Sequence, residues 1–529
     1  MALPNYVAAA KPAPLANRAA WYKTTAQTYA GIMLWFAFWQ NMPGGGGTPG
    51  GAIAAGIWPA LLGIVVAALI CHFLFYLVPG LLGMRTGLPL YIVGTSTYGV
   101  QGGFVMPGFV MGLLQFCWLA FNAFFVSEML CANFDIGTEG GKVLVPGPIH
   151  GIIAAVWAVL AAFVGLKGIQ YLAKVATYLP LIPLVVLIIL FVKTIGGVGQ
   201  YDPKQLTEAK PKAAATDKKT DDKKTDAAKT DEAKTDDAKT ADAKDGDKTK
   251  TEAKKDEKAK DAKADEKPKS PLDSMGVMLL MIGSIVGFFA TAGAAGTDIA
   301  SSNRDDKDVQ LGGLTGIALA TVFSAGLAVL IVAGAYGTPG MVPEASQGEL
   351  NPVKLMASIL DNKQMATVFA ILLAISSFPP ACFSAFIAAN SFKTTMPNVN
   401  PFTSVGIGTA VAIVLAVTGW AGNAVDVFLL IGASFGPVCG AMVADYLLSG
   451  RKWAGPRAGM NPAGWISWAV GFVVGGFGLI AKYIPALGEL GIEVPVAPVA
   501  AFVVGFVLYI VLAKAGLQSK TLEMPAAAK

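Results

Sequence analysis

The sequence predicts an all-α membrane protein of about twelve transmembrane helices, built from two inverted five-helix repeats and two extra helices. Three observations lead to this prediction: high hydrophobicity, apolar runs of membrane-spanning length, and the position of one charged segment. Hydrophobic residues make up 54% of the 529 residues, and the mean hydropathy is +0.57. Charged residues are only 14% of the chain, and many of them lie within 201–269.

Apolar runs of roughly 18–25 residues recur outside that segment, and this length crosses a hydrocarbon core about 30 Å thick. Because backbone groups in lipid must find hydrogen-bond partners within the chain, such runs form helices. Lys and Arg residues favour one side of the predicted membrane, which places both termini in the cytoplasm and the chain in the cell inner (plasma) membrane. The predicted spans are 26–40, 53–78, 103–130, 149–164, 171–195, 274–296, 311–335, 365–389, 405–420, 424–448, 465–484 and 494–512.

The segment 201–270 is a low-complexity run dominated by Lys, Asp, Ala and Thr. It has too few apolar residues to offset the entropy of ordering, so we expect it to be disordered. Each charge at mid-membrane costs about 2.5–3.5 kcal/mol, so the segment cannot cross the bilayer, and the topology makes it periplasmic. We interpret it as a tolerated insertion, with a tether or wall-binding arm as the alternative.

The position of this insertion predicts the domain organisation. Roughly five spans precede it and seven follow, and a long insertion is easiest to accommodate at the joint between inverted repeats. In such folds the first helix of each repeat is interrupted, and Gly followed by aromatic residues near Gly31 and Gly287 fits that pattern, with close packing as the alternative. The predicted parts are tail 1–25, first repeat 26–200, insertion 201–270, second repeat 271–450, extra helices 451–515 and tail 516–529.

The third predicted span carries the clearest set of candidate binding residues. Gln115, Trp118 and Asn122 are spaced i, i+3, i+7 and therefore share one helix face. A buried amide without a partner costs of order one to several kcal/mol, and facing a substrate cavity would satisfy it. An aromatic surface beside amides suits a planar ring with donors and acceptors at its edge. The alternative is an amide that bonds a neighbouring helix beside a packed Trp.

The eighth predicted span contains Ser376 and Ser377, followed by Phe378 and the pair Pro379-Pro380. Adjacent hydroxyls next to a helix-disrupting proline pair could surround a small cation together with freed backbone carbonyls. Hydrogen bonds from the serines back to their own helix are the alternative.

Signatures of enzymes are missing from the sequence. We find no Gly-rich phosphate loop, no HExxH motif and no Cys/His ligand spacing, so we expect neither enzymatic activity nor a cofactor. The five cysteines fit neither a disulfide nor a metal pattern, and we interpret them as packing residues. Glu128, Asp298 and Asp445 lie near the ends of predicted spans, where we expect gate or interface roles.

The sequence resembles the nucleobase–cation symporter-1 family, in particular its cytosine permease-like members, through most of its membrane portion. The likeness is carried by Thr-Gly-Leu-Pro at 86–89, Thr-Tyr-Gly-Val at 97–100, Gln-x-x-Trp at 115–118, the segment 287–298 and the segment 437–447. The resemblance implies a leucine-transporter-type fold and a secondary active transporter, which imports a nucleobase or related small planar heterocycle by symport with sodium or protons. Neither a nucleic acid nor a cofactor is implied.

The resemblance also implies roles for individual residues. Trp118 would be a stacking surface, Gln115 an edge hydrogen-bonder and Phe289 the opposing aromatic residue, with Phe288 and Asn122 also at the substrate. A sodium ion would lie between the first and eighth helices. Its ligands would be backbone oxygens near Gly31 and Trp35 and the hydroxyls of Ser376 and Ser377.

Departures from the family pattern leave the substrate open. Leu373 stands where cytosine transporters carry a substrate-contacting Asn, and Phe288 replaces a small polar residue. Purines, uracil, hydantoin, allantoin and thiamine-like rings therefore all remain candidates. Two alternatives remain: a same-fold symporter for another small solute, and a non-transporting membrane receptor or scaffold. The sequence leaves the oligomeric state and the choice between sodium and protons open.

Overall fold

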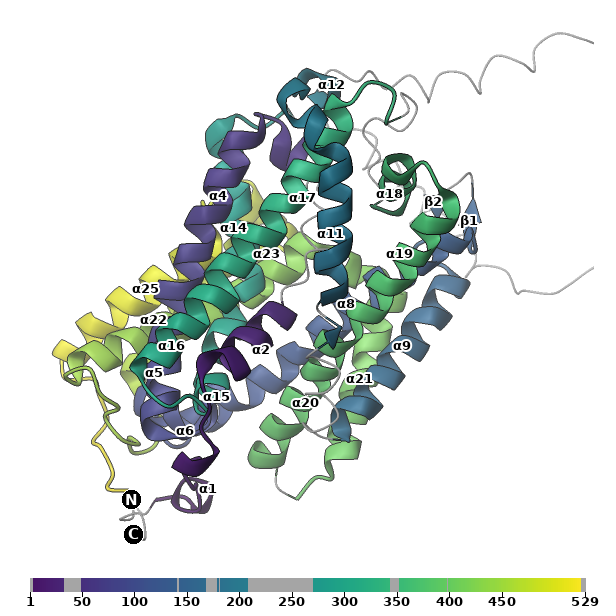
Figure 1. Ribbon diagram of the computed structural model, residues 1–529. Helices are drawn as coiled ribbons and strands as arrows, with labels where there is room; N and C mark the ends of the chain where they lie inside the picture. Colours follow the sequence, from purple (N-terminus) through teal and green to yellow (C-terminus); the bar gives the residue numbers. More distant parts are fainter. Residues whose placement is uncertain are drawn as a thin grey trace, which may run out of the picture.

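The computed structural model describes residues 3–32, 49–139, 142–167, 178–179, 181–207, 270–342, 352–396 and 398–524. Long helices gather side by side into one bundle (Figure 1). Ten helices in these residues are long and apolar enough to cross a membrane, which confirms the all-α, multi-pass membrane fold. The count of twelve is not established by the described residues. One apolar helix, Pro401–Val417, is shorter, and the first predicted span runs into 33–48, outside the described residues.

The first half of the bundle contains five of the predicted spans in part or in full. α4 (Ile57–Ile70) passes through a π-helical turn into α5 (Leu77–Thr86) and forms one long span. A second π-helical turn, Phe104–Phe109, precedes α8. The helices are α2 (Thr25–Ile32), α4 (Ile57–Ile70), α5 (Leu77–Thr86), α8 (Val110–Phe134), α9 (Pro148–Leu166) and α11 (Leu181–Thr194).

The second half repeats this pattern. α16 (Asp306–Gly313) passes through a π-helical turn, Leu314–Leu319, into α17 (Ala320–Gly337). That turn contacts the π-helical turn Cys71–Tyr76 between α4 and α5, so the second helices of the two halves meet at matching irregularities. The helices are α14 (Ser274–Ala294), α15 (Gly296–Ala300), α16 (Asp306–Gly313), α17 (Ala320–Gly337), α18 (Pro352–Leu360), α19 (Lys363–Ser376), α20 (Phe378–Thr395) and α21 (Pro401–Val417).

The final helices, α22 (Ala424–Leu448), α23 (Pro462–Tyr483) and α25 (Ala497–Lys514), pack on one another. Shorter elements connect or flank the long helices: α1 (Asn5–Ala8), α6 (Leu90–Val93), α7 (Thr95–Tyr98), α12 (Lys204–Thr207), α24 (Pro485–Gly488) and the two-residue strands β1 (Thr138–Glu139) and β2 (Lys142–Val143). β1 and β2 pair antiparallel. α1 and α12 lie at opposite ends of the bundle (Figure 1).

The predicted interruption of the sixth span is displaced toward its end. α14 runs without a break through Gly287 and Gly293, and the helix is interrupted only at Ala295. These two glycines are packing positions: a Cβ at Gly293 would lie 2.7 Å from Phe75 Cβ, and one at Gly287 would lie 2.8 Å from the Phe428 carbonyl oxygen. Close helix contact therefore explains them better than a mid-helix break.

The start of the predicted insertion is folded. α12 lies within 201–207, and the buried Leu206 belongs to it. Tyr201 donates a hydrogen bond to the Ile53 carbonyl oxygen over 2.9 Å. The remainder, 208–269, lies outside the described residues.

A buried polar network ties the last helices to the rest of the bundle. Arg457 forms an ion pair with Asp445 of α22 at 3.0 Å, and both side chains are buried. Tyr509 of α25 donates a hydrogen bond to the same carboxylate over 2.9 Å, and Arg457 also donates to the Ser96 carbonyl oxygen in α7. Asp445 thus joins three segments at an interface.

Candidate functional site

A cavity opens among α8, α14, α15 and α20, with about 600 Å³ of empty space including its mouth. Among the residues that the structure describes, the lining contains no ionisable side chain and is mostly apolar. It consists of Gln115, Trp118 and Asn122 from α8, Phe288, Thr291, Ala292 and Ala295 from α14 and its end, Ile299 from α15, and Pro380, Phe383, Ser384 and Ile387 from α20.

All three residues predicted on one face of the third span lie in this wall. The helical period brings Gln115, Trp118 and Asn122 to the same side of α8, and all three line the cavity. Of the two phenylalanines predicted at the substrate, Phe288 lines it as well. Phe289 does not: its ring is fully buried and lies 5.7 Å from the ring of Tyr29. Consecutive residues point about 100° apart on a helix, and here the second phenylalanine points toward Tyr29 rather than into the cavity.

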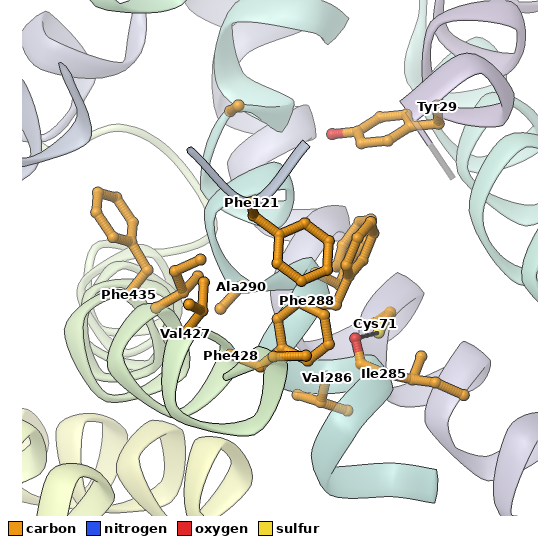
Figure 2. Close-up of a cluster of buried hydrophobic side chains, with 14 of the residues drawn as sticks. Tyr29, Cys71, Phe121, Ile285, Val286, Phe288, Ala290, Val427, Phe428 and Phe435 are labelled. Carbon is orange, nitrogen blue, oxygen red and sulfur yellow. Dashed lines mark hydrogen bonds between the residues drawn. The ribbon is translucent and has the colours of Figure 1, made fainter. Parts of the chain in front are cut away.

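The ring of Trp118 is held from several sides. It meets Phe288 edge-on, with ring centroids 4.8 Å apart, and Phe428 of α22 lies 5.8 Å away. Its indole nitrogen donates a hydrogen bond to Thr291 Oγ1 over 3.0 Å. Figure 2 shows Phe121, Phe288 and Phe428 gathered in one cluster where α8, α14 and α22 meet. The direct contact with Phe288 leaves no room for a ligand between these two rings.

The two amides in the wall differ in what they bond. Within the described part of the chain, the hydrogen bond of the Gln115 amide is the one from Nε2 to Met111 Sδ, at 3.4 Å. A thioether is a weak acceptor, so this amide keeps most of its capacity for a ligand. Asn122, in contrast, donates to the Ser377 carbonyl oxygen over 3.0 Å and accepts from Trp157 Nε1 over 2.9 Å.

On the α20 side of the cavity, Pro380 is noted from the sequence only as a helix-disrupting residue, and Phe383, Ser384 and Ile387 are not predicted. Pro380, Phe383, Ser384 and Ile387 are spaced i, i+3, i+4, i+7 and face the cavity together. The same spacing that identified the α8 face could have identified this one. Leu373, interpreted as a departure at the substrate, is buried and does not appear in the cavity wall.

The two serines of the eighth span lie where α19 ends and α20 begins. Ser376 Oγ donates to the Leu373 carbonyl oxygen over 2.8 Å, and Ser377 Oγ donates to the Ala374 carbonyl oxygen over 2.7 Å. Both bonds return to the serines' own helix, which is the alternative given in the sequence analysis. Each hydroxyl oxygen nevertheless keeps lone pairs that could bind a cation. No group of three or more His, Cys, Asp or Glu side chains that could hold a metal ion occurs among the described residues.

The proline pair adds backbone oxygens to this place. In a continuous helix the carbonyls of Ile375 and Ser376 would accept from the N–H groups of residues 379 and 380, which are prolines without N–H. Hydroxyl and carbonyl oxygens are the hard ligands that small hard cations prefer, so the donor set fits sodium. α2 contacts α20 and includes Gly31, one residue before its end, whereas Trp35 lies outside the described residues.

Known structures share the fold of this protein over nearly the whole chain. A structure of Mhp1, a nucleobase-cation-symport-1 family transporter, in a closed conformation with bromovinylhydantoin bound, matches with a TM-score of 0.59 at 15% identity. The match covers 97% of this chain and 96% of that one. The chain has the Mhp1 fold. An inward-facing Mhp1 structure matches with a TM-score of 0.57 at 16% identity, covering 98% of this chain and 96% of that chain.

A third structure with the same fold is a Na⁺-coupled sialic acid symporter in a substrate-bound outward-open state. It matches with a TM-score of 0.54 at 12% identity, covering 96% of this chain and 92% of that one. No protein-family model matches the chain, and no curated protein sequence matches it. The Mhp1 fold thus confirms the predicted leucine-transporter-type architecture.

Proposed function

We propose that this chain belongs to the nucleobase–cation symporter-1 family and is a secondary active transporter of the inner membrane. It imports a nucleobase or related small planar heterocycle together with sodium, and both termini face the cytoplasm. The observation that carries the proposal is the cavity bordered by Trp118 and Gln115, whose wall carries no charged side chain among the described residues. Such a wall offers an aromatic face and an amide. These two surfaces complement the flat face and the polar edge of a neutral heteroaromatic ring.

The ring would lie against Trp118, with its polar edge toward the Gln115 amide. Since Phe288 already contacts Trp118 directly, the second aromatic surface in this arrangement is Phe383 of α20 rather than Phe288 or Phe289. Bromovinylhydantoin, bound in the similar Mhp1 structure, is a substituted planar heterocycle of this kind.

The cation would bind at the Ser376–Ser377 interruption, between α2 and the start of α20. Sodium is favoured over protons because the interruption offers neutral oxygen atoms as ligands. In addition, the described residues of the cavity wall include no carboxylate or imidazole that could carry a proton. The hydroxyls of Ser376 and Ser377 and the freed carbonyls beside them would supply ligands. Backbone oxygens near Gly31 and Trp35 would complete the set.

A same-fold symporter for an anionic solute is the second candidate, because a sialic acid symporter shares the fold. A carboxylate in a low-dielectric cavity needs a cationic or multiply hydrogen-bonding partner. The described wall provides no Lys, Arg or His. The cavity therefore favours a neutral ring.

Uptake into proteoliposomes tests the proposal. Labelled cytosine, uracil, hypoxanthine, allantoin and hydantoin are offered under an inward sodium gradient, an inward proton gradient, or neither. We expect sodium-stimulated uptake of at least one ring, lost in Trp118→Ala and retained in the control Trp58→Ala, whose side chain is 80% exposed. Failure of every ring in folded protein under both gradients would exclude the nucleobase assignment.

A deletion separates transport from the receptor or scaffold alternative. Because 201–207 packs on the bundle, the deletion should remove only 208–269. Retained uptake would support the transporter. Folded protein that loses every activity through this deletion would favour the scaffold, with the charged insertion as its working part.

A further inference from the structure

We propose that Asn122 is a positioning residue that holds the interruption at Ser377, and so couples cation binding there to the state of the cavity. This inference rests on the proposed cation symport. It differs from the role that sequence alone suggests, in which the Asn122 amide binds the substrate directly.

The amide of Asn122 is oriented by its partners. The side chain is buried, with 4% exposed. A carbonyl oxygen can only accept and an indole N–H can only donate, so the contacts with Ser377 and Trp157 assign Nδ2 to the first and Oδ1 to the second. A flipped amide would place donor against donor and acceptor against acceptor. The side chain therefore has one favourable orientation.

The bond to Ser377 reaches the point where the eighth span is interrupted. Ser377 closes α19 and precedes α20, and its own hydroxyl is one of the proposed cation ligands. A hydrogen bond to its carbonyl oxygen fixes the plane of the following peptide. Because residues 379 and 380 are prolines, the neighbouring carbonyls of Ile375 and Ser376 lose the donors that a continuous helix would supply, and their directions depend on how this short segment is held.

Trp157 of α9 completes the arrangement. Its indole nitrogen donates to Asn122, and its ring meets Phe378, the residue after Ser377, edge-on at 5.2 Å. The same indole thus touches both the positioning amide and the first residue of α20. Three helices, α8, α9 and α20, are joined within one turn of the proposed cation ligands.

The commitment of Asn122 also argues against direct substrate binding. Each polar atom of the amide already bonds another segment, so a ligand could use only the second N–H of Nδ2 and the second lone pair of Oδ1. Gln115, about two turns away on the same helix face, makes only the weak bond to Met111 Sδ and keeps more of its donors and acceptors for a ligand. Substrate recognition then falls to Gln115 and the aromatic surfaces, and Asn122 transmits the position of α8 to the cation ligands.

Binding of radioactive sodium to the purified full-length protein tests this inference without a known substrate. We expect Asn122→Ala to raise the half-saturating sodium concentration about tenfold, the effect typical of losing a residue that orients metal ligands. Trp157→Phe keeps the ring and loses only the donor, and we expect a rise of about threefold. Ser324→Ala and Trp420→Phe serve as matched controls, because both lie away from the cavity and should keep the wild-type midpoint.

Uptake supplies the second readout. In Asn122→Ala the rate at saturating sodium should recover toward that of the wild type, because the ligands are displaced and not removed. Folded variants with a wild-type sodium midpoint and only a raised substrate KM would overturn the inference and make Asn122 a direct ligand. If Asn122→Ala does not fold, Trp157→Phe decides between the two results. Absence of saturable sodium binding in the wild type would instead overturn the proposed sodium coupling, and this inference with it.

Discussion

The indole of Trp118 in α8 donates to the hydroxyl of Thr291 in α14 over 3.0 Å, beside the cavity. Because the same ring meets Phe288 edge-on, its orientation is set by α14 as much as by α8. A ligand that lies against Trp118 is therefore sensitive to movement between these helices, even where it touches only one of them.

Thr291→Val should weaken substrate binding without altering the cation site. Valine has nearly the shape of threonine but lacks the acceptor, so the indole N–H loses its partner at a cost of about 1–3 kcal/mol. We expect the KM for uptake to rise severalfold while the half-saturating sodium concentration stays unchanged. Thr291→Ser keeps the hydroxyl and should behave like the wild type. A wild-type KM in Thr291→Val together with a raised KM in Thr291→Ser would show that the methyl group matters, and not the hydrogen bond.

Two glycines of α14 should respond oppositely to alanine. A Cβ at Gly293 would lie 2.7 Å from Phe75 Cβ, whereas one at Gly283 meets nothing within 4 Å. Gly293→Ala must push α14 away from the π-helical turn Cys71–Tyr76, which contains Phe75. We expect a lower thermal midpoint in detergent together with reduced uptake. Gly283→Ala should be neutral or slightly stabilising, by up to about 1 kcal/mol, because alanine favours helix. Unchanged stability in Gly293→Ala would mean that the helices separate readily there.

Much of the fold follows from local sequence properties. Span length and hydropathy predict where the helices lie, because a backbone in lipid must satisfy its own hydrogen bonds and a helix does so within one segment. The face shared by Gln115, Trp118 and Asn122 follows from helical periodicity alone. The interruption of α14 does not: a glycine that breaks a helix and a glycine that packs against Phe75 look alike in sequence. Only the neighbouring helix distinguishes the two.

Long-range contacts decide what the candidate site residues do. Phe288 and Phe289 are adjacent and chemically identical, so the sequence could not tell which ring faces the cavity. Asn122 finds its partners, Trp157 and Ser377, 35 and 255 positions away along the chain. The spacing of nearby residues cannot predict hydrogen-bond partners that are so distant in sequence. The sequence could therefore identify the binding face but could not separate the amide that is free for a ligand from the amide that is bonded.

Phe383→Ala tests the aromatic surface that sequence reasoning missed. If the substrate ring stacks on Phe383, its removal should cost about 1–3 kcal/mol of binding, as for bases on aromatic side chains. That corresponds to a rise in KM of about 5- to 150-fold. The control is Phe402→Ala, because Phe402 of α21 is 56% exposed and lies outside the cavity wall. A KM that stays at the wild-type value in Phe383→Ala would place the substrate against Trp118 alone.

The Asp445–Arg457 ion pair should matter far more for stability than the Lys482–Asp426 pair. Asp445→Asn would leave the Arg457 charge buried opposite a neutral group, and breaking a buried pair from one side costs about 3–5 kcal/mol. Lys482 is 51% exposed on its side chain, so Lys482→Gln should cost at most about 1 kcal/mol. Thermal unfolding in detergent measures both. A large loss in Asp445→Asn would show that the last helices are held through this carboxylate, because Tyr509 of α25 bonds the same atom. Similar small losses in both variants would instead mean that water reaches Arg457 and that packing among α22, α23 and α25 holds these helices without the ion pair.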